Sequence, residues 1–195
     1  VVAIVDPDRA GTDAATHVGV GAGIPVVATV ADAVARGADA ILIGTAAAAG
    51  RIPDGFRPFL ADALRRGIEV WNGLHERVLD DPALRAAAEA GHARVRELRE
   101  PPRDLPIGGH RSPREGAVVV LTVGSDAAVG KMTASLEIAA ALRRAGRTAA
   151  FVATGQTGIA IAGEGISVDA VVADFIAGAT ERMVCDAAEG ADWVV

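Results

Sequence analysis

The chain has 195 residues, of which 51% are hydrophobic and 23% are charged. This is enough apolar material for one large domain or two compact ones, and it excludes a disordered chain. The net charge of −6 indicates no general nucleic-acid-binding surface, and the single cysteine excludes both a disulfide framework and a cysteine-rich zinc site.

Over the first hundred residues, short β-branched runs alternate with stretches rich in Ala and Arg. The expected strands lie at 1–5, 24–30, 40–43 and 68–71, and the expected helices lie at 31–36, 56–66 and from Asp81 to about residue 100. Nearly continuous hydrophobic strands are typical of a parallel sheet that is buried on both faces. The alternation predicts an α/β, doubly wound unit over residues 1–100.

Residues 101–116 contain four prolines and three glycines, a density that no helix or strand tolerates, so we expect a linker or an exposed connection there. A second α/β unit follows over residues 117–195. Its expected strands lie at 117–123, 148–153 and 192–195, and its expected helices lie at 131–144, 169–179 and 181–188. Because the chain begins and ends inside apolar runs, we expect each of the two parallel sheets to be truncated at the nearer end of the chain.

A glycine-bounded loop lies between the first strand and the first helix of the second unit. It consists of Gly124, Ser125, Asp126, Ala127, Ala128, Val129, Gly130, Lys131, Met132 and Thr133. Glycines let successive backbone N–H groups converge on one anion, the following helix presents its positive end to that anion, and a lysine reaches the outer phosphates. Lys131 is the only lysine beside 18 arginines. The loop therefore predicts phosphate binding by residues 124–133, and the alternative is a glycine-rich turn with a solvated lysine.

The loop departs from the common phosphate-binding pattern in two ways. Five residues instead of four separate its glycines, and Met132 instead of Ser or Thr follows the lysine. A magnesium-binding hydroxyl would then come from Thr133, or be absent. The five-residue spacing resembles the loops of dethiobiotin synthetase-type proteins.

Further candidate residues follow other strands, where parallel sheets bind ligands. Gln156 and Thr157 follow the strand at 148–153 and could bind a ligand, or they form a polar turn. Asp174 could face a magnesium ion or an amine, while Asp169 is better interpreted as a helix cap. His75 follows the strand at 68–71, where a general acid or base could stand, although a lone histidine is more often structural.

Asp6 ends the first strand and could hold a ribose hydroxyl, but a turn aspartate is favoured. We interpret His92 as part of a solvated helix face, Cys185 as a small core residue, and the histidine spacing as giving no zinc site.

Three segments resemble the DgcN-type D-glutamate N-acetyltransferase family, formerly a domain of unknown function. They are GKMT at 130–133, ATGQTGI at 153–159 and DAVVADFIAG at 169–178. VVAIVDPDRAG and VWNGLHERVLDDP resemble the first half of that family. The resemblance implies a Rossmann-like unit followed by a P-loop NTPase-like unit, with Met132 as the family's own form of the loop. It also implies that an acidic residue follows position 195, so the chain by itself could be inactive.

The resemblance implies transfer of an acetyl group from acetyl-CoA to the amine of D-glutamate, an acidic amino acid. In that hypothesis the loop holds the pyrophosphate of coenzyme A, and Asp174 or His75 is the catalytic base. The alternatives are an ATP-dependent ligase or kinase that uses ATP with Mg2+ held through Thr133, and a nucleotide-binding module that is not an enzyme. We expect a cytoplasmic protein with no nucleic-acid or membrane partner, and the Ala-rich helices suggest a homo-oligomer.

Overall fold

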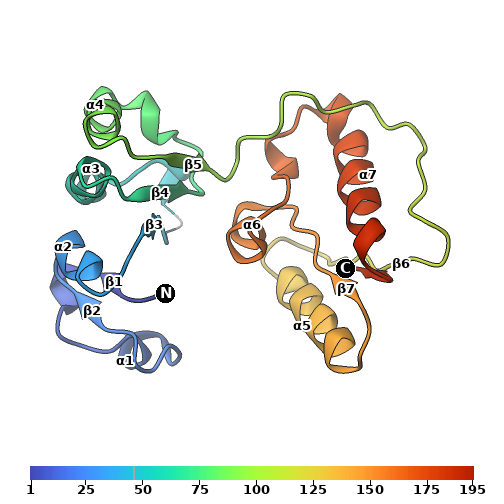
Figure 1. The fold of residues 1–195 in the computed structure, drawn as a ribbon, viewed down its shortest axis with the longest axis horizontal. Coiled ribbons are helices and arrows are strands. Elements are labelled where there is room, and N and C mark those ends of the chain that lie inside the picture. Colours follow the sequence, from blue (N-terminus) through green and yellow to red (C-terminus); the bar gives the residue numbers. More distant parts are fainter. Residues whose placement is uncertain (46) are drawn as a thin grey trace. The chain divides into compact units, whose positions relative to one another are not determined.

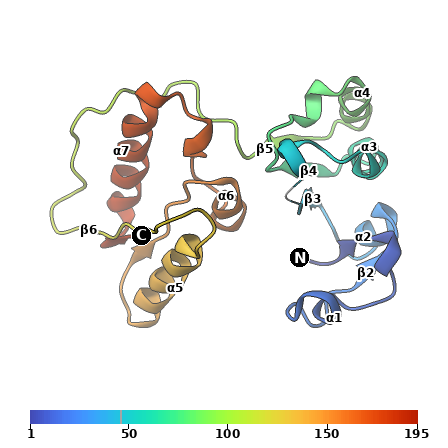
Figure 2. The same ribbon diagram turned by 180° about the vertical axis from the view of Figure 1, so that it is seen from behind.

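The computed structural model describes residues 1–45 and 47–195, which divide into two compact units, Val1–Glu97 and Leu98–Val195. Figures 1 and 2 show both units from opposite sides.

The first unit contains two short parallel sheets. In one sheet, β1 (Ile4–Val5) pairs with β2 (Val26–Val27), and in the other the strand order is β3 (Ala40–Leu42), β4 (Glu69–Asn72) and β5 (Val95–Glu97). Its α-helices are α1 (Ala14–Val18), α2 (Val30–Val34), α3 (Arg57–Arg65) and α4 (Pro82–Gly91). Short 3-10 helices span Pro7–Arg9, Ala48–Gly50, Asp54–Phe56 and Val78–Asp80.

The main core of this unit lies between β4 and the helix pair α3 and α4. Val70 of β4, Leu64 of α3 and Leu84 of α4 are almost completely buried in one cluster. Gly91 allows the close approach of the two helices, since a Cβ there would lie 1.9 Å from the carbonyl oxygen of Leu64. This packing holds β4 and the loop that follows it in place.

The second unit has one parallel sheet with the strand order β6 (Val118–Val119), β8 (Trp193–Val194) and β7 (Ala149–Ala150). Its α-helices are α5 (Lys131–Arg144), α6 (Gln156–Ala162) and α7 (Ala173–Gly190), and a 3-10 helix spans Val168–Ala170.

The connections decide where these helices lie. The crossover through α5 leads from β6 to β7, and the crossover through α7 leads back to the central strand β8. Parallel crossovers are right-handed, so two that run in opposite directions place their helices on opposite faces of the sheet. Helices α5 and α6 are the next helices in the chain after the carboxyl ends of β6 and β7, while α7 ends just before β8. The starts of all three helices therefore belong to the carboxyl edge of the sheet.

The structure confirms the expected α/β architecture with parallel sheets but corrects several elements. The helix from Asp81 ends at Gly91, because His92 adopts a left-handed conformation (φ 51°) that closes the last turn, and β5 follows. His92 is therefore a helix C-cap rather than part of a helix face. The two helices expected at 169–179 and 181–188 form the single helix α7, and α6 occupies a stretch expected to be a loop.

The Pro- and Gly-rich segment 101–116 forms no α-helix or strand in the described chain and lies along α7. Gly109 donates its N–H to Glu181 (2.8 Å), and Arg182 pairs with Asp104 (3.3 Å). At Gly178 an added Cβ would lie 1.9 Å from the carbonyl oxygen of Pro106. The segment therefore packs against the second unit, while the domain boundaries at 100 and 117 stay a prediction.

Candidate phosphate-binding site

The predicted phosphate-binding loop lies between β6 and α5, at the carboxyl edge of the second sheet. All of its residues from Gly124 to Gly130 are exposed. Ala128 (φ 53°) and Gly130 (φ 95°) are left-handed, which turns the chain back toward the start of α5. At Gly124 an added Cβ would lie 2.8 Å from Val129 Cγ2 and 3.2 Å from the Lys131 side chain, so only glycine leaves room for the lysine stem.

The hydrogen bonds of this loop leave its donors ready for an anion. Lys131 Nζ donates to the carbonyl oxygen of Asp126, which folds the ammonium group back over the loop. Asp126 Oδ1 accepts the N–H of Ala127 at 2.7 Å. Within residues 1–45 and 47–195, no side chain caps the start of α5. The first N–H groups of this 14-residue helix therefore remain available, together with its positive dipole end, and the loop fits a phosphate group.

The first turn of α5 distinguishes the hydroxyl groups near the loop. Thr133 is exposed and, in the part of the chain that the structure describes, makes no hydrogen bond through its side chain. Ser135 is buried and shares a 2.8 Å hydrogen bond with Thr122, which joins α5 to the end of the β6 segment. Thr133, like the exposed Ser125 of the loop, therefore keeps a hydroxyl that a ligand could reach, and its role with magnesium stays a prediction.

Other predicted residues lie at the same edge of this sheet. Gln156 and Thr157 are the first two residues of α6, and Asp174 lies in the first turn of α7. Asp174 and Thr157 are exposed, and Gln156 is partly buried. As with α5, no side chain in the described residues caps α6 or α7. The topology thus places the loop and these three residues at one sheet edge.

Asp169 does not cap a helix as expected, because α7 begins only at Ala173. Its Oδ1 accepts a hydrogen bond from the buried hydroxyl of Ser167 (2.7 Å), and its Oδ2 accepts one from Arg99. Asp169 therefore ties residue 99 to the 3-10 helix Val168–Ala170.

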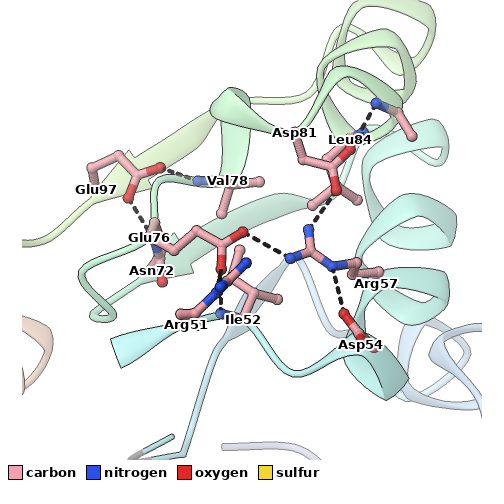
Figure 3. A network of polar contacts seen from close by, with 11 residues as sticks. Arg51, Ile52, Asp54, Arg57, Asn72, Glu76, Val78, Asp81, Leu84 and Glu97 are labelled. Atoms are coloured by element: carbon pink, nitrogen blue, oxygen red, sulfur yellow. Dashed lines mark hydrogen bonds and ion pairs between the residues drawn. The ribbon is translucent and has the colours of Figure 1, made fainter. Parts of the chain in front are cut away.

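In the first unit, a polar network occupies the carboxyl end of β4 (Figure 3). Arg57 donates to Glu76 (2.7 Å), to Asp81 and to Asp54 (3.3 Å). The hydrogen bond from Arg57, followed by that from the N–H of Ile52, lowers the pKa of Glu76. The network was not foreseen from the sequence, because its members are spread over residues 52–97.

The second part of this network is centred on Asn72, which is completely buried. Its Nδ2 donates to Glu97 Oε2 (Figure 3) and to the carbonyl oxygen of Glu76, both at 2.7 Å. Its Oδ1 accepts the N–H of Leu74 at 3.0 Å. Glu97 Oε1 in turn accepts the N–H of Val78 at 2.8 Å. These bonds satisfy the buried amide and fix the loop at 73–78.

His75 lies in this fixed loop and is exposed. Its N–H donates to the carbonyl oxygen of Gly50 (2.9 Å), and a Cβ at Gly50 would lie 2.4 Å from His75 Cδ2, so the ring rests against that glycine. Of the two candidate bases, His75 belongs to the first unit and Asp174 to the second. Asp6 pairs with Arg9 (2.6 Å) and caps Pro7–Arg9, which are the contacts of a turn aspartate.

Comparisons with known proteins agree with this division of the chain. Residues 7–101 match the family model described as "Domain of unknown function (DUF1611_N) Rossmann-like domain", and residues 106–195 match "Domain of unknown function (DUF1611_C) P-loop domain". The chain belongs to the DUF1611 family. This confirms the expected order of a Rossmann-like unit followed by a P-loop unit.

Two curated relatives, from Tritonibacter scottomollicae and a Pseudoalteromonas species, are named D-glutamate N-acetyltransferase. They are 39% and 33% identical to this chain, over 81% and 83% of its length. A crystal structure of a DUF1611 family protein from Anabaena variabilis matches with a TM-score of 0.85 and 34% identity, over 100% of this chain and 56% of that one. This chain spans about half the length of the curated relatives that it matches, 47% and 48%.

Among the described residues, no helix is long and apolar enough to cross a membrane. In the same part of the chain, no group of three His, Cys, Asp or Glu side chains lies together as a metal site would require.

Proposed function

We propose that this chain supplies the phosphate-binding part of an N-acetyltransferase that transfers an acetyl group from acetyl-CoA to the amine of D-glutamate. One observation carries the proposal. The exposed loop 124–130, its single lysine and the start of α5, which no side chain of the described residues caps, lie in a chain that is 39% identical to a protein named D-glutamate N-acetyltransferase. This loop and the helix start account for the binding of a pyrophosphate, and the named relatives suggest the acyl chemistry.

In this proposal the loop residues bind and orient the acyl donor. The N–H groups of residues 128–131 and the start of α5 hold the pyrophosphate of acetyl-CoA, whose thioester presents the carbonyl to be attacked. Lys131 leaves the carbonyl of Asp126 and donates to a phosphate oxygen instead. Gln156 and Thr157, at the start of α6 on the same edge, contribute further hydrogen bonds to the ligand.

The acceptor amine must lose a proton before it can attack a thioester carbonyl. Asp174 and His75 are the candidate bases, and both side chains are exposed. Asp174 lies in the first turn of α7, at the carboxyl edge of the second unit's sheet, and His75 follows the carboxyl end of β4 in the first unit. Of the two, Asp174 shares its unit with the phosphate-binding loop. Asp174→Asn should therefore lower kcat more than His75→Gln, with little change in donor affinity.

One observation favours a second candidate, an ATP-dependent ligase or kinase. Thr133 lies on the first turn of α5, and its hydroxyl makes no hydrogen bond to any residue that the structure describes, so a magnesium ion bound to ATP could be held there. This candidate and the transferase share the phosphate contacts, so the identity of the ligand separates them. A nucleotide-binding module without enzymatic activity remains the third reading.

The test measures thermal stabilisation of the protein by acetyl-CoA and by Mg-ATP, for the wild type, Lys131→Ala and Arg144→Ala. Arg144 is an exposed cation at the opposite end of α5 and serves as the matched control. A ligand at a hundred times its Kd adds about 2.7 kcal/mol of stability. We expect acetyl-CoA to do so in the wild type and the control but not in Lys131→Ala. Stabilisation by Mg-ATP alone would instead support the ligase or kinase.

A further inference from the structure

A cavity of about 740 Å³ lies against the outer edge of β7 in the second unit, and none of the phosphate-loop residues 124–133 lines it. Its volume is within the range of small-molecule sites. The lining comes from the end of α5, from β7 and the residues after it, and from the C-terminal half of α7. The cavity thus lies along the edge of β7 that pairs with no other strand among the described residues.

The base of this cavity is apolar. Phe151 follows β7, and Ile166 and Met183 come from the buried cluster of this unit. Both of the latter are almost fully buried, with 6% and 9% of their surfaces exposed. A ligand in the cavity would therefore meet hydrocarbon along its body.

The rim of the cavity is cationic in a chain whose net charge is −6. It carries three arginines (143, 147 and 182) against two carboxylates, Glu164 and Asp186. Arg182 pairs with Asp104 (3.3 Å) and Arg143 Nε donates to the carbonyl oxygen of Ala149 (2.9 Å). Among the described residues the Arg147 side chain forms no hydrogen bond or ion pair. Its charge lies close enough to Asp192 to lower the pKa of that carboxyl, after the larger effects of Arg114 and Thr148. One guanidinium group is therefore available at the rim.

Two features decide against a protein strand as the occupant. Arg143 donates a hydrogen bond to the carbonyl oxygen of Ala149 on the outer edge of β7. An added strand would need this carbonyl, so the row of backbone groups open for pairing is interrupted. A second copy that paired edge to edge would also bring two arginine-rich rims together. The backbone N–H of Phe151, which has no partner in the described residues, remains for a small acceptor.

We propose that this cavity binds a small organic anion, a carboxylate or sulfonate on an apolar body, with Arg147 pairing with the anionic group. The apolar base accepts the body of the ligand, and the exposed guanidinium provides charge-assisted hydrogen bonds to its oxygens. The proposal does not rest on the proposed function, because the two sites share no residue.

The test uses 8-anilinonaphthalene-1-sulfonate, an anion with an apolar body that fluoresces when it leaves water, with the intact chain at neutral pH. We expect saturable binding to one site per chain, and at least tenfold weaker binding to Arg147→Gln. Arg144→Gln, a neighbouring exposed arginine that does not line the cavity, should stay within twofold of the wild type. Far- and near-UV circular dichroism checks that each variant is folded.

A second comparison separates charge from apolar contact. 4-Phenylbutyrate should displace the probe, and its neutral analogue 4-phenylbutanol should do so at least tenfold less effectively. Lys131→Ala should leave probe binding unchanged. Equal binding to Arg147→Gln, equal competition by the alcohol, loss of binding in Lys131→Ala or no saturable binding would each overturn the proposal.

Discussion

The two units differ most at the carboxyl edges of their sheets. In the first unit that edge is closed by the protein's own side chains, with Asn72 completely buried and bonded to Glu97. In the second unit the corresponding edge carries an exposed loop and Lys131, whose ammonium group donates to the carbonyl oxygen of Asp126 and to no other group among the described residues. The same kind of edge is thus self-satisfied in one unit and open to an anion in the other.

The starts of the helices show the same difference. Asp13, Thr29 and Asp81 cap three of the four described α-helices of the first unit, α1, α2 and α4, while α3 has no side-chain cap among the described residues. In the second unit, side-chain caps are absent from all three described helices, α5, α6 and α7. A capping side chain uses the N–H groups that would otherwise bind an anion. We infer that the second unit carries the anion-binding edge and that the first unit is built for rigidity there.

Of the substitutions that test this difference between the two edges, Arg57→Gln is expected to have the largest effect. The substitution leaves Glu76, Asp81 and Asp54 without their shared cation, and we expect a loss of about 2–3 kcal/mol in the stability of the first unit. Urea unfolding can be followed through Trp71 of β4 after Trp193 is replaced by Phe, because each unit contains one tryptophan.

Arg66→Gln is the matched control for that measurement. Arg66 directly follows α3, the helix that Arg57 begins, and it pairs with Asp62 at 2.9 Å, but both side chains are more than 40% exposed. Exposed pairs contribute little, so the loss should be below about 0.5 kcal/mol. Equal losses in the two variants would show that the network does not stabilise the edge.

A smaller effect is expected from acid. The Arg57 hydrogen bond lowers the pKa of Glu76, and the N–H of Ala83 followed by that of Leu84 and by Arg57 lowers the pKa of Asp81. A carboxyl whose folded pKa is depressed stabilises the fold above its ordinary pKa, and this contribution is lost as the pH falls through the folded value. The first unit should therefore lose stability below about pH 4.5, the ordinary value for Glu.

The same acid titration of Arg57→Gln separates the two carboxylates. The variant should lose less stability on acidification, because the main cause of the Glu76 shift is gone, while Asp81 keeps its backbone donors. Parallel curves for the variant and the wild type, measured by urea midpoints between pH 3 and pH 7, would contradict this assignment.

The sequence predicted the open edge better than the closed one. The phosphate-binding loop is contiguous, so its glycines, its lysine and the following helix could be recognised together at 124–144. Asn72 and Glu97 lie 25 residues apart, and their bond depends on the register of β4 and β5, which pairs these two residues. No local pattern indicates such a pair. In addition, the sequence predicted the end of a helix, rather than a strand, at β5.

The misplaced helix ends have local physical causes. In α4 the left-handed residue is His92 (φ 51°), one position after Gly91, so the glycine lies inside the last turn and not at the position where it would mark the helix end. In α7, two helices were expected at 169–179 and 181–188, whereas Gly178 is an interior glycine of one helix and lets the backbone of Pro106 come close. Tertiary contact, rather than local propensity, placed that residue.

A change confined to the open edge is expected from Gly124→Ala. The added Cβ would meet Val129 Cγ2 at 2.8 Å and displace the Lys131 stem, so binding of the phosphate ligand should weaken about tenfold, or about 1.4 kcal/mol. Because the loop is exposed, the unfolding midpoint should change little. Gly55→Ala, where no atom lies within 4 Å of the added Cβ, should leave both quantities unchanged. Calorimetric titration of each variant with the phosphate ligand measures the affinity. An undiminished affinity in Gly124→Ala would show that the loop 124–130 does not bind the phosphate.

The smallest effect tests the capping difference itself. Val172 precedes α7, is 66% exposed and has extended backbone angles (φ −58°, ψ 135°) that suit a capping residue. Val172→Asp would supply the missing acceptor and an acidic group at the positive end of α7, so we expect a gain of about 0.5–1 kcal/mol in the stability of the second unit. Trp193 fluorescence in a Trp71→Phe background reports this gain. Val172→Asn separates the cap from the charge, since it keeps the acceptor without the negative charge. If the helix starts of this edge together attract an anion, the Asp variant should also bind the phosphate ligand less tightly than the Asn variant, and the difference should shrink as salt is added.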